Sequence, residues 1–214
     1  MIYRGKPMRM TKDDFKIIEK KCLHRGHLTV DEVILRHKLF EGGMTNPISR
    51  EVVQRAAAVG VLPYDPIRDE VVLIRQFRTG VMIAQQNPWL VETVAGLIEE
   101  NETPEDVARR ECIEETGCEI SELHHICDFF SSPGMLSEVV KMYCGITSTT
   151  NAGGFHGLKQ EDEDIEAIIV PWSQLCDDID AKKCFDPKIM LAVMWLAPRR
   201  TELRKRFTDQ TTPL

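Results

Sequence analysis

The sequence predicts an α/β protein preceded by a small β unit. Two observations support this class: β-branched, partly alternating runs recur along the chain, and helical segments lie between and after the later runs. The chain has 214 residues, of which 43% are hydrophobic. A chain of this length can bury an adequate core without disulfide or metal staples. We therefore expect one domain of ordinary size with a smaller appendage.

Early runs interrupted by glycines are typical of β-strands. They cover residues 14–23, 28–40 and 49–64. Gly26, Gly42 and Gly43 separate these runs at positions where the chain can turn. We expect a small β unit over about the first 45 residues.

The rest of the chain mixes strand-like and helical segments. Residues 69–77 follow a turn and form a continuous apolar run, which indicates a buried strand. Further strand-like segments cover residues 124–130, 137–146 and 164–170, and helical segments cover residues 173–180 and 187–207. Residues 148–164 carry three glycines and no apolar period, so we expect a long surface loop there.

One further helix is predicted directly after Thr103. Threonine can cap a helix, Pro104 suits the first helical position, and Asp106 completes a spacing like that of a capping box. The negative charge of Asp106 also favours the positive end of the helix. Gly117 is expected to end it.

This helix places carboxylates on its core-facing side. At about 100° per residue, an arc of roughly 140° contains Val107, Ala108, Glu111, Cys112 and Glu115. Glu114 lies about 20° beyond this arc. A solvated acidic face is the ordinary interpretation of such a helix. Carboxylates one turn apart beside apolar residues repel each other and lose hydration, however, and a divalent metal with oxygen ligands compensates for both effects.

The charge distribution indicates the class of ligand. The net charge is -7, yet residues 99–122 alone hold ten carboxylates against two arginines, and residues 161–166 add five more. The remainder is mildly basic, without the broad basic surface that nucleic-acid binding requires, so we expect no nucleic-acid partner. Two acidic foci in such a frame suit a protein that collects divalent cations and then an anionic ligand.

Cysteine usage and hydropathy predict a cytoplasmic protein. The seven cysteines contain no C-x-x-C pair, so neither a disulfide framework nor a zinc ribbon fits, and we expect reduced, mostly buried thiols. No apolar run reaches the roughly 18 residues of a membrane span. The first residues also lack the apolar segment of a secretory signal.

The acidic helix and the segment before it form a recognisable motif. The segment GLIEENETPEDVARRECIEETGC, residues 96–118, resembles the Nudix box. Every fixed position of that pattern is matched, by Gly96, Glu102, Arg110, Glu111, Glu114, Glu115 and Gly117. Cys112 and Cys118 stand where the pattern usually has aliphatic residues, and both are small enough to be buried.

The resemblance implies a Nudix hydrolase, with an α/β/α sandwich around a mixed sheet. Such an enzyme hydrolyses a nucleoside diphosphate linked to another moiety, using Mg²⁺ or Mn²⁺. By position, Glu111 and Glu115 would ligate the metal together with the backbone carbonyl of Ala95. Arg110 would take part in the catalytic site and, with Glu102, brace the loop and the helix. For Glu114 the resemblance leaves a metal ligand and a structural role equally open.

Beyond the box, residues 50–196 resemble the bacterial ADP-ribose pyrophosphatases. The resemblance rests on Pro133, fifteen residues past the box, on the strand-turn-strand LPYDPIRDEVVLIRQFR and on the EDEDI loop. It implies hydrolysis of ADP-ribose to AMP and ribose 5-phosphate. The substrate-binding residues implied are Arg50, Arg78, Pro133, Gly134 and Glu138. An acidic residue of the loop would activate water: Glu161 is the first choice for this catalytic base and Glu163 the second.

The same resemblance implies a domain-swapped homodimer formed through the N-terminal β unit. We accordingly divide the chain into a dimerising unit, residues 1–47, and a Nudix hydrolase domain, residues 48–214. The expected partner is a small nucleotide-sugar substrate, without nucleic acid or membrane. Two alternatives stay open: hydrolysis of another nucleoside diphosphate sugar of the GDP-mannose type, and a catalytically silent module that senses ADP-ribose.

Overall fold

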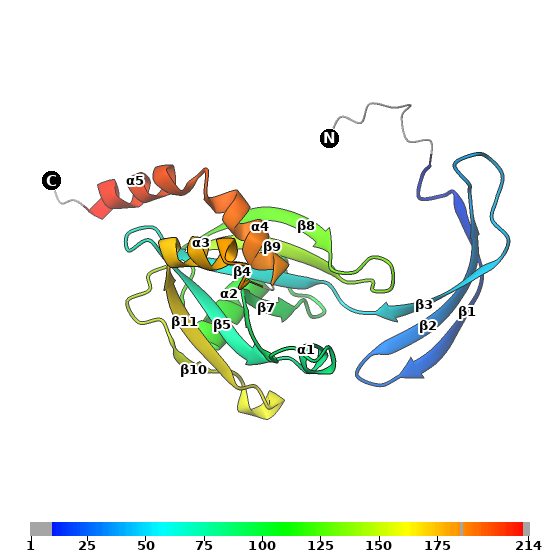
Figure 1. The fold of residues 1–214 in the computed structure, drawn as a ribbon, viewed down its shortest axis with the longest axis horizontal. Helices are drawn as coiled ribbons and strands as arrows, with labels where there is room; N and C mark the ends of the chain where they lie inside the picture. Colours follow the sequence, from blue (N-terminus) through cyan, green and yellow to red (C-terminus); the bar gives the residue numbers. More distant parts are fainter. Residues whose placement is uncertain (1–9, 185, 212–214) are drawn as a thin grey trace. The chain divides into compact units, whose positions relative to one another are not determined.

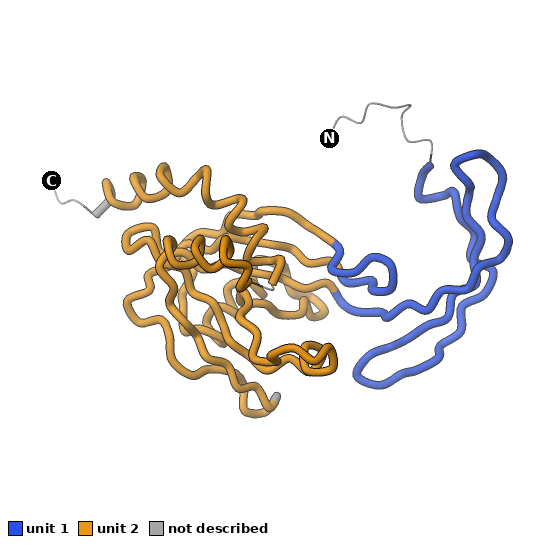
Figure 2. Tube along the Cα trace, viewed as in Figure 1, with its two compact units in different colours: residues 1–56, 130–138 blue, residues 57–129, 139–214 orange. Residues whose placement is uncertain are grey.

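The structure is a computed structural model that describes residues 10–184 and 186–211, without the side chains of Glu161, Gln210 and Thr211. The chain forms two compact units, coloured separately in Figure 2. One unit contains the described residues up to Ala56 together with Phe130–Glu138. The other contains Ala57–Phe129 and the described residues from Val139 onward.

The smaller unit is built on an antiparallel three-stranded sheet. Its strands, in the order β1-β2-β3, are β1 (Phe15–Arg25), β2 (Thr29–His37) and β3 (Ile48–Gln54). The predicted antiparallel β unit is therefore confirmed. Because β3 pairs with β2, this sheet extends past residue 47, and the division into ranges 1–47 and 48–214 stays a prediction. Residues 1–9 and 212–214 of those ranges lie outside the described residues.

The larger unit contains an eight-stranded mixed sheet with helices (Figure 1). Its strands are β4 (Ala58–Asp65), β5 (Glu70–Phe77), β6 (Trp89–Glu92), β7 (Val94–Leu97), β8 (Glu122–Phe130), β9 (Val139–Ile146), β10 (Gly154–His156) and β11 (Ile165–Pro171). Its helices are α1 (Thr79–Ile83), α2 (Pro104–Thr116), α3 (Trp172–Asp180), α4 (Pro187–Leu196), α5 (Arg200–Thr211) and the 3₁₀ turn η1 (Lys159–Glu161). The order is β10-β11-β5-β4-β9-β8, with β6 on β5 and β7 on β4, and β4 runs parallel to β9.

Both faces of strand β4 are buried, and each face packs against a separate hydrophobic cluster. Val59 and Val61 pack in a cluster with the apolar side of α2, while the alternate residues Leu62 and Tyr64 pack with α3 and α4. The sheet thus has helices on both faces. The α/β/α sandwich implied by the sequence resemblance is confirmed.

Some predicted elements are divided differently in the structure. The single strand expected over residues 49–64 is wrong: the run comprises β3 and β4, which belong to different sheets, and the chain passes between them at residues 55–57. The helix expected over residues 187–207 is interrupted by a turn at 197–199 around Pro198, because proline has no backbone N–H to donate to the preceding helical turn. The segment 148–164, expected as a loop, contains β10 and η1.

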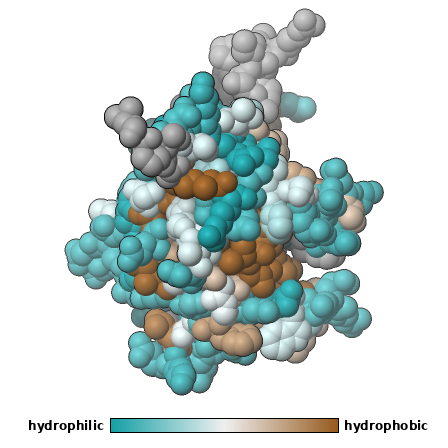
Figure 3. Space-filling model, turned by 90° about the vertical axis from the view of Figure 1, so that its left-hand side faces the viewer, coloured by the Kyte–Doolittle hydropathy of each residue, from teal (hydrophilic) through white to brown (hydrophobic). Residues whose placement is uncertain are grey.

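Three further observations concern the helices, the surface and the cysteines, for which the sequence predicted reduced and mostly buried thiols. Within residues 10–184 and 186–211, no helix combines the length and apolar character needed to cross a membrane. On one face of the molecule, apolar side chains form small patches among hydrophilic ones (Figure 3). All seven cysteines are unpaired; Cys112, Cys118 and Cys144 are buried, whereas Cys22 is exposed.

Candidate active site

Helix α2 begins and ends as its sequence predicts. The Thr103 hydroxyl oxygen accepts a hydrogen bond from the Asp106 backbone N–H at 3.2 Å and donates one to the Asp106 carboxylate at 2.6 Å. Pro104 occupies the first turn. Gly117 takes the left-handed conformation, with φ of 71°, and its N–H donates to the Ile113 carbonyl.

The helix turns two glutamates away from solvent. Glu115 is only 3% exposed, and the Glu111 side chain is 14% exposed. The neighbouring apolar side of α2, including Val107 and Cys112, is completely buried. An ordinary solvated face therefore does not describe Glu111 and Glu115, which lie at the edge of the core.

Arg110 ties three glutamates together. Its Nε and Nη2 donate to the two Glu102 carboxylate oxygens at 3.0 and 3.2 Å. Its Nη1 donates to Glu111 at 2.8 Å and to Glu114 at 2.9 Å. Glu102 also accepts from the Glu99 backbone N–H, so this arginine joins the preceding loop to the helix, as the sequence resemblance implies.

Strand β7 runs directly over the two buried glutamates. The Ala95 backbone N–H donates to Glu115 Oε2 at 3.1 Å. A Cβ atom at Gly96 would overlap the Glu111 carboxylate, so any other residue would force this glutamate out of the position in which Arg110 holds it. The first fixed residue of the box is thus explained by the position of Glu111.

Burial makes both glutamates weaker acids. Loss of hydration raises the pKa of Glu111 to about 7, a rise that the positive charge and hydrogen bond of Arg110 oppose. Loss of hydration likewise raises the pKa of Glu115 to about 8, and the Ala95 hydrogen bond and the charge of Arg78 oppose that rise. Full ionisation of the pair at neutral pH therefore needs an additional cation.

The donor set fits a hard divalent cation. Among the described residues, no three His, Cys, Asp or Glu side chains are grouped as a complete metal site. Mg²⁺ is usually bound through one or two carboxylates, with water and substrate phosphates completing its coordination. Glu111, Glu115 and the nearby backbone of Ala95 supply that kind of partial set. Glu114 is engaged by Arg110.

The acidic loop lies beside the end of α2. The Gly157 N–H points to the Glu114 carbonyl at 3.5 Å, and Gly157 has a positive φ of 99°. The negative charge of Glu163 contributes to raising the pKa of both Glu111 and Glu115, and its carboxylate accepts from the Leu158 backbone N–H at 3.4 Å. Glu161 is the last residue of η1, and its side chain is outside the described part of the structure.

Comparison with known proteins shows the family. The family model described as the NUDIX domain matches residues 54–191. This chain belongs to the Nudix family.

Several Nudix relatives cover nearly the whole chain. The ADP-ribose pyrophosphatase of Escherichia coli K12 is 39% identical over 201 residues, which are 94% of this chain and 96% of that protein. The ADP-ribose pyrophosphatase of Haemophilus influenzae is 33% identical over 200 residues, 92% of each chain. A GDP-mannose pyrophosphatase of Escherichia coli O1:K1 is 35% identical over 170 residues, 78% of this chain and 81% of that protein.

A solved structure shows the same fold at lower sequence identity. The crystal structure of an ADP compounds hydrolase superposes with a TM-score of 0.63 at 19% identity, covering 87% of this chain and 96% of that chain. The resemblance that residues 96–118 carry is therefore confirmed at the level of both family and fold.

The other predicted site residues of this Nudix protein are divided between its two units. Arg78 follows β5 in the larger unit, which also holds the box. Arg50, Pro133, Gly134 and Glu138 belong to the smaller unit, where the first three are exposed.

Within the smaller unit, Glu138 has a partner that the sequence analysis missed. Arg55 donates to the Glu138 carboxylate through Nε at 2.9 Å, and its backbone N–H donates to the Ser137 hydroxyl at 2.9 Å. Among the described residues, the Arg50 side chain donates to the carbonyl of its neighbour Ser49, at 2.7 Å. The Arg55 pairing joins residues far apart in sequence, and no local motif marks it.

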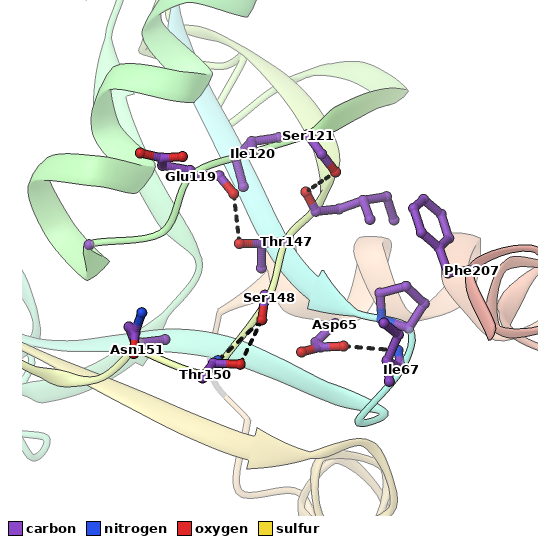
Figure 4. A pocket seen from close by; sticks show the side chains of 14 residues that line it. Asp65, Ile67, Glu119, Ile120, Ser121, Thr147, Ser148, Thr150, Asn151 and Phe207 are labelled. Atoms are coloured by element: carbon purple, nitrogen blue, oxygen red, sulfur yellow. Dashed lines mark hydrogen bonds between the residues drawn. The ribbon is translucent and has the colours of Figure 1, made fainter. Parts of the chain in front are cut away.

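A separate cleft of about 610 Å³ lies at the far end of α2, near Gly117 (Figure 4). The predicted site residues are not among those that line it. Its hydroxyl groups are paired within the protein: Thr147 donates to the Glu119 carbonyl at 2.8 Å and Ser121 donates to the Ile146 carbonyl at 3.0 Å. The size of this cleft therefore does not mark it as the Nudix site.

Without metal, the free energy of unfolding should fall as the pH rises from about 4.5 to about 8. The pKa of Glu115 is about 8 in the folded protein, against an ordinary value of 4.5, so folded Glu115 retains a proton that the unfolded chain releases. Raising the pH through this window therefore favours unfolding, and the contribution is fully present only below the lower value. Thermal melts in EDTA from pH 5 to 8.5 measure the effect.

The matched variant for this measurement is Glu115→Gln, which cannot titrate. Its melting temperature should change less across the window than that of the unsubstituted protein. A difference between the two proteins that stays constant with pH would show that burial does not perturb Glu115.

Proposed function

We propose that this protein hydrolyses the pyrophosphate bond of ADP-ribose, releasing AMP and ribose 5-phosphate, with Mg²⁺ or Mn²⁺ as cofactor. The observation that carries the proposal is the assembled box, in which Glu111 and Glu115 lie buried beneath Ala95 and Gly96. The names of relatives that share 33–39% identity over nearly the whole chain support ADP-ribose as the substrate.

Glu111 and Glu115 hold the metal in this proposal, and the Ala95 carbonyl completes the protein ligands. A bound divalent cation neutralises phosphoryl charge and orients a water molecule. Arg110 keeps the Glu111 carboxylate in place through its 2.8 Å contact, and Glu114 serves as a further candidate ligand.

We assign proton transfer from the attacking water to the loop after β10. Glu161 accepts the proton of the attacking water, with Glu163 as the second candidate. The water oxygen forms a bond to one phosphorus while the bridging P–O bond breaks, and the bridging oxygen leaves with the other phosphate. Arg50 and Arg78 pair with the diphosphate, Pro133 and Gly134 also bind the substrate, and Glu138 lies near the terminal ribose.

The smaller unit serves as the homodimer interface in this proposal. Every residue of β1 is exposed, and its exposed side chains include Phe15, Ile17, Ile18 and Leu23. Apolar side chains in such number on one strand favour burial against a second copy of the chain. We place the enzyme in the cytoplasm, with no nucleic-acid or membrane partner.

Two other functions compete with this proposal. The 35% identical GDP-mannose pyrophosphatase supports another nucleoside diphosphate sugar as substrate. A silent ADP-ribose sensor is disfavoured, because each ionisable residue of the box is present and Arg110 pairs with both Glu102 and Glu111.

A substrate panel tests the function. With Mg²⁺, ADP-ribose should give the highest kcat/KM among ADP-ribose, GDP-mannose and a dinucleoside polyphosphate, and EDTA should abolish turnover. Product analysis in ¹⁸O-labelled water identifies the phosphorus attacked. A higher kcat/KM for GDP-mannose would overturn the substrate but leave the Nudix chemistry, whereas binding of ADP-ribose without turnover of any compound would favour the sensor.

A further inference from the structure

Four charged side chains form a continuous network between β5, β6 and α4. Arg78 Nε contacts Glu92 Oε2 at 2.5 Å, and the other oxygen of Glu92 lies 3.5 Å from Lys188 Nζ. Lys188 Nζ in turn lies 3.0 Å from the Asp186 carboxylate. The network alternates cation and anion, so each inner charge has an opposite charge on both sides.

Three members of this network are largely buried. Glu92 is 8% exposed and Asp186 is 2% exposed, and Lys188 is largely covered. A charged group is costly to bury even when paired, and apolar residues of similar volume often fill such a space at no loss of stability. The proposed hydrolysis uses Arg78 alone, so the other three charges call for a separate explanation.

Asp186 attaches the network to the backbone of two different segments. Its carboxylate caps α4 by accepting from the Lys188 backbone N–H at 2.9 Å. It also accepts from the backbone N–H of Thr93 at 3.0 Å, in the link between β6 and β7. The start of α4 is thereby joined to the strand that carries Ala95, over the buried glutamates.

The network engages only one side of the Arg78 guanidinium. Within the described residues, the Arg78 side chain donates through Nε to Glu92, and no hydrogen bond or ion pair involves its two Nη groups. The side chain is partly exposed, and its positive charge reaches Glu115. An arginine held through Nε keeps its terminal N–H groups available for an anion.

We propose that Glu92, Lys188 and Asp186 are positioning residues, which hold Arg78 so that its Nη groups meet the diphosphate of the substrate. Lys188 holds Glu92 in place beside Arg78, and Asp186 anchors Lys188 to the start of α4. The inference rests on the proposed function, because it assigns a role to the arginine that the substrate would contact.

A double-mutant cycle in kcat/KM tests this inference, using Arg78→Ala, Glu92→Gln and their combination. Arg78→Ala should lower kcat/KM about tenfold to a hundredfold, chiefly through KM, by loss of a charge-assisted contact. Glu92→Gln should lower it about tenfold, the scale of residues that orient a contacting group. In the Arg78→Ala background the same change should cost less than about twofold, because Glu92 then has no arginine to hold.

Equal effects of Glu92→Gln in both backgrounds would overturn the inference, since a purely structural role adds to the loss of Arg78. So would a Glu92→Gln effect confined to kcat. Lys188→Met provides a second cycle with the same criterion if Glu92→Gln does not reach the native circular dichroism spectrum. The control is Asp128→Asn on β8. This change removes a carboxylate that binds Lys141 at 2.8 Å, and it should leave kcat/KM unchanged.

The unsubstituted protein separates this inference from the proposed function. The cycle uses whichever nucleoside diphosphate sugar gives the highest kcat/KM, so a different substrate preference corrects the substrate alone. Failure of the unsubstituted enzyme to hydrolyse any of them would overturn both statements before a variant is made.

Discussion

Replacing Glu115 by glutamine is expected to lower kcat by more than about a hundredfold while the protein stays folded. A hundredfold is the upper range for residues that only support a metal ligand, and Glu115 is proposed to be a ligand itself. Glutamine has the same shape, and its side-chain oxygen can still accept the Ala95 N–H bond that Glu115 accepts at 3.1 Å. Steady-state kinetics with saturating Mg²⁺, together with circular dichroism, measure the two parts of this result.

The control for this variant is Glu105→Gln on the same helix. Glu105 accepts a hydrogen bond from the Tyr143 hydroxyl at 3.0 Å, which glutamine can also accept, and it lies outside the proposed metal site. Its kcat should stay within about twofold of the original, as for a surface change away from special features. A nearly unchanged kcat for Glu115→Gln, or full turnover in EDTA, would refute the metal assignment.

Glu161→Gln is expected to lower kcat by roughly 10² or more without weakening substrate binding, because general-base contributions are of that size. Glu163→Gln should have the smaller effect on kcat. The structure makes Glu163 the natural comparison, since its charge reaches Glu111 and Glu115 from the same loop.

Kinetics of both loop variants, with binding measured by calorimetry in the absence of turnover, decide between the two residues. If the two phenotypes are exchanged, Glu163 is the base. If neither variant slows turnover, the loop does not supply the base at all.

The centre of the candidate site was predictable because it is local. Residues spaced for one face of a capped helix must lie together once the helix forms, so the meeting of Glu111 and Glu115 at the core edge followed from sequence. The contact between Arg110 and Glu102 also lies within the box. The partners of Arg78 did not follow, because Glu92 and Lys188 come together only through sheet pairing and the placement of α4.

The fold was predictable where hydrophobic pattern alone decides an element. Buried β5 and the capped α2 are such cases, with continuous apolar residues in one and clear end signals in the other. The short strands β6 and β7 and the five-residue α1 were missed, because segments of this length carry too few residues to show a period. The change of sheet between β3 and β4 was missed because no turn signal separates them in the sequence, and only burial distinguishes the partly exposed β3 from the fully buried β4.

The parallel pairing of β4 with β9 has a consequence for how the molecule is assembled. Ala58 lies opposite Val140, and the chain between them contains β7 and the whole of α2. Pairing partners so distant in sequence requires closure of a long loop, which costs entropy and slows folding. During synthesis α2 leaves the ribosome well before β9, so the sheet against which this helix packs is completed only after the helix and its two glutamates have been made.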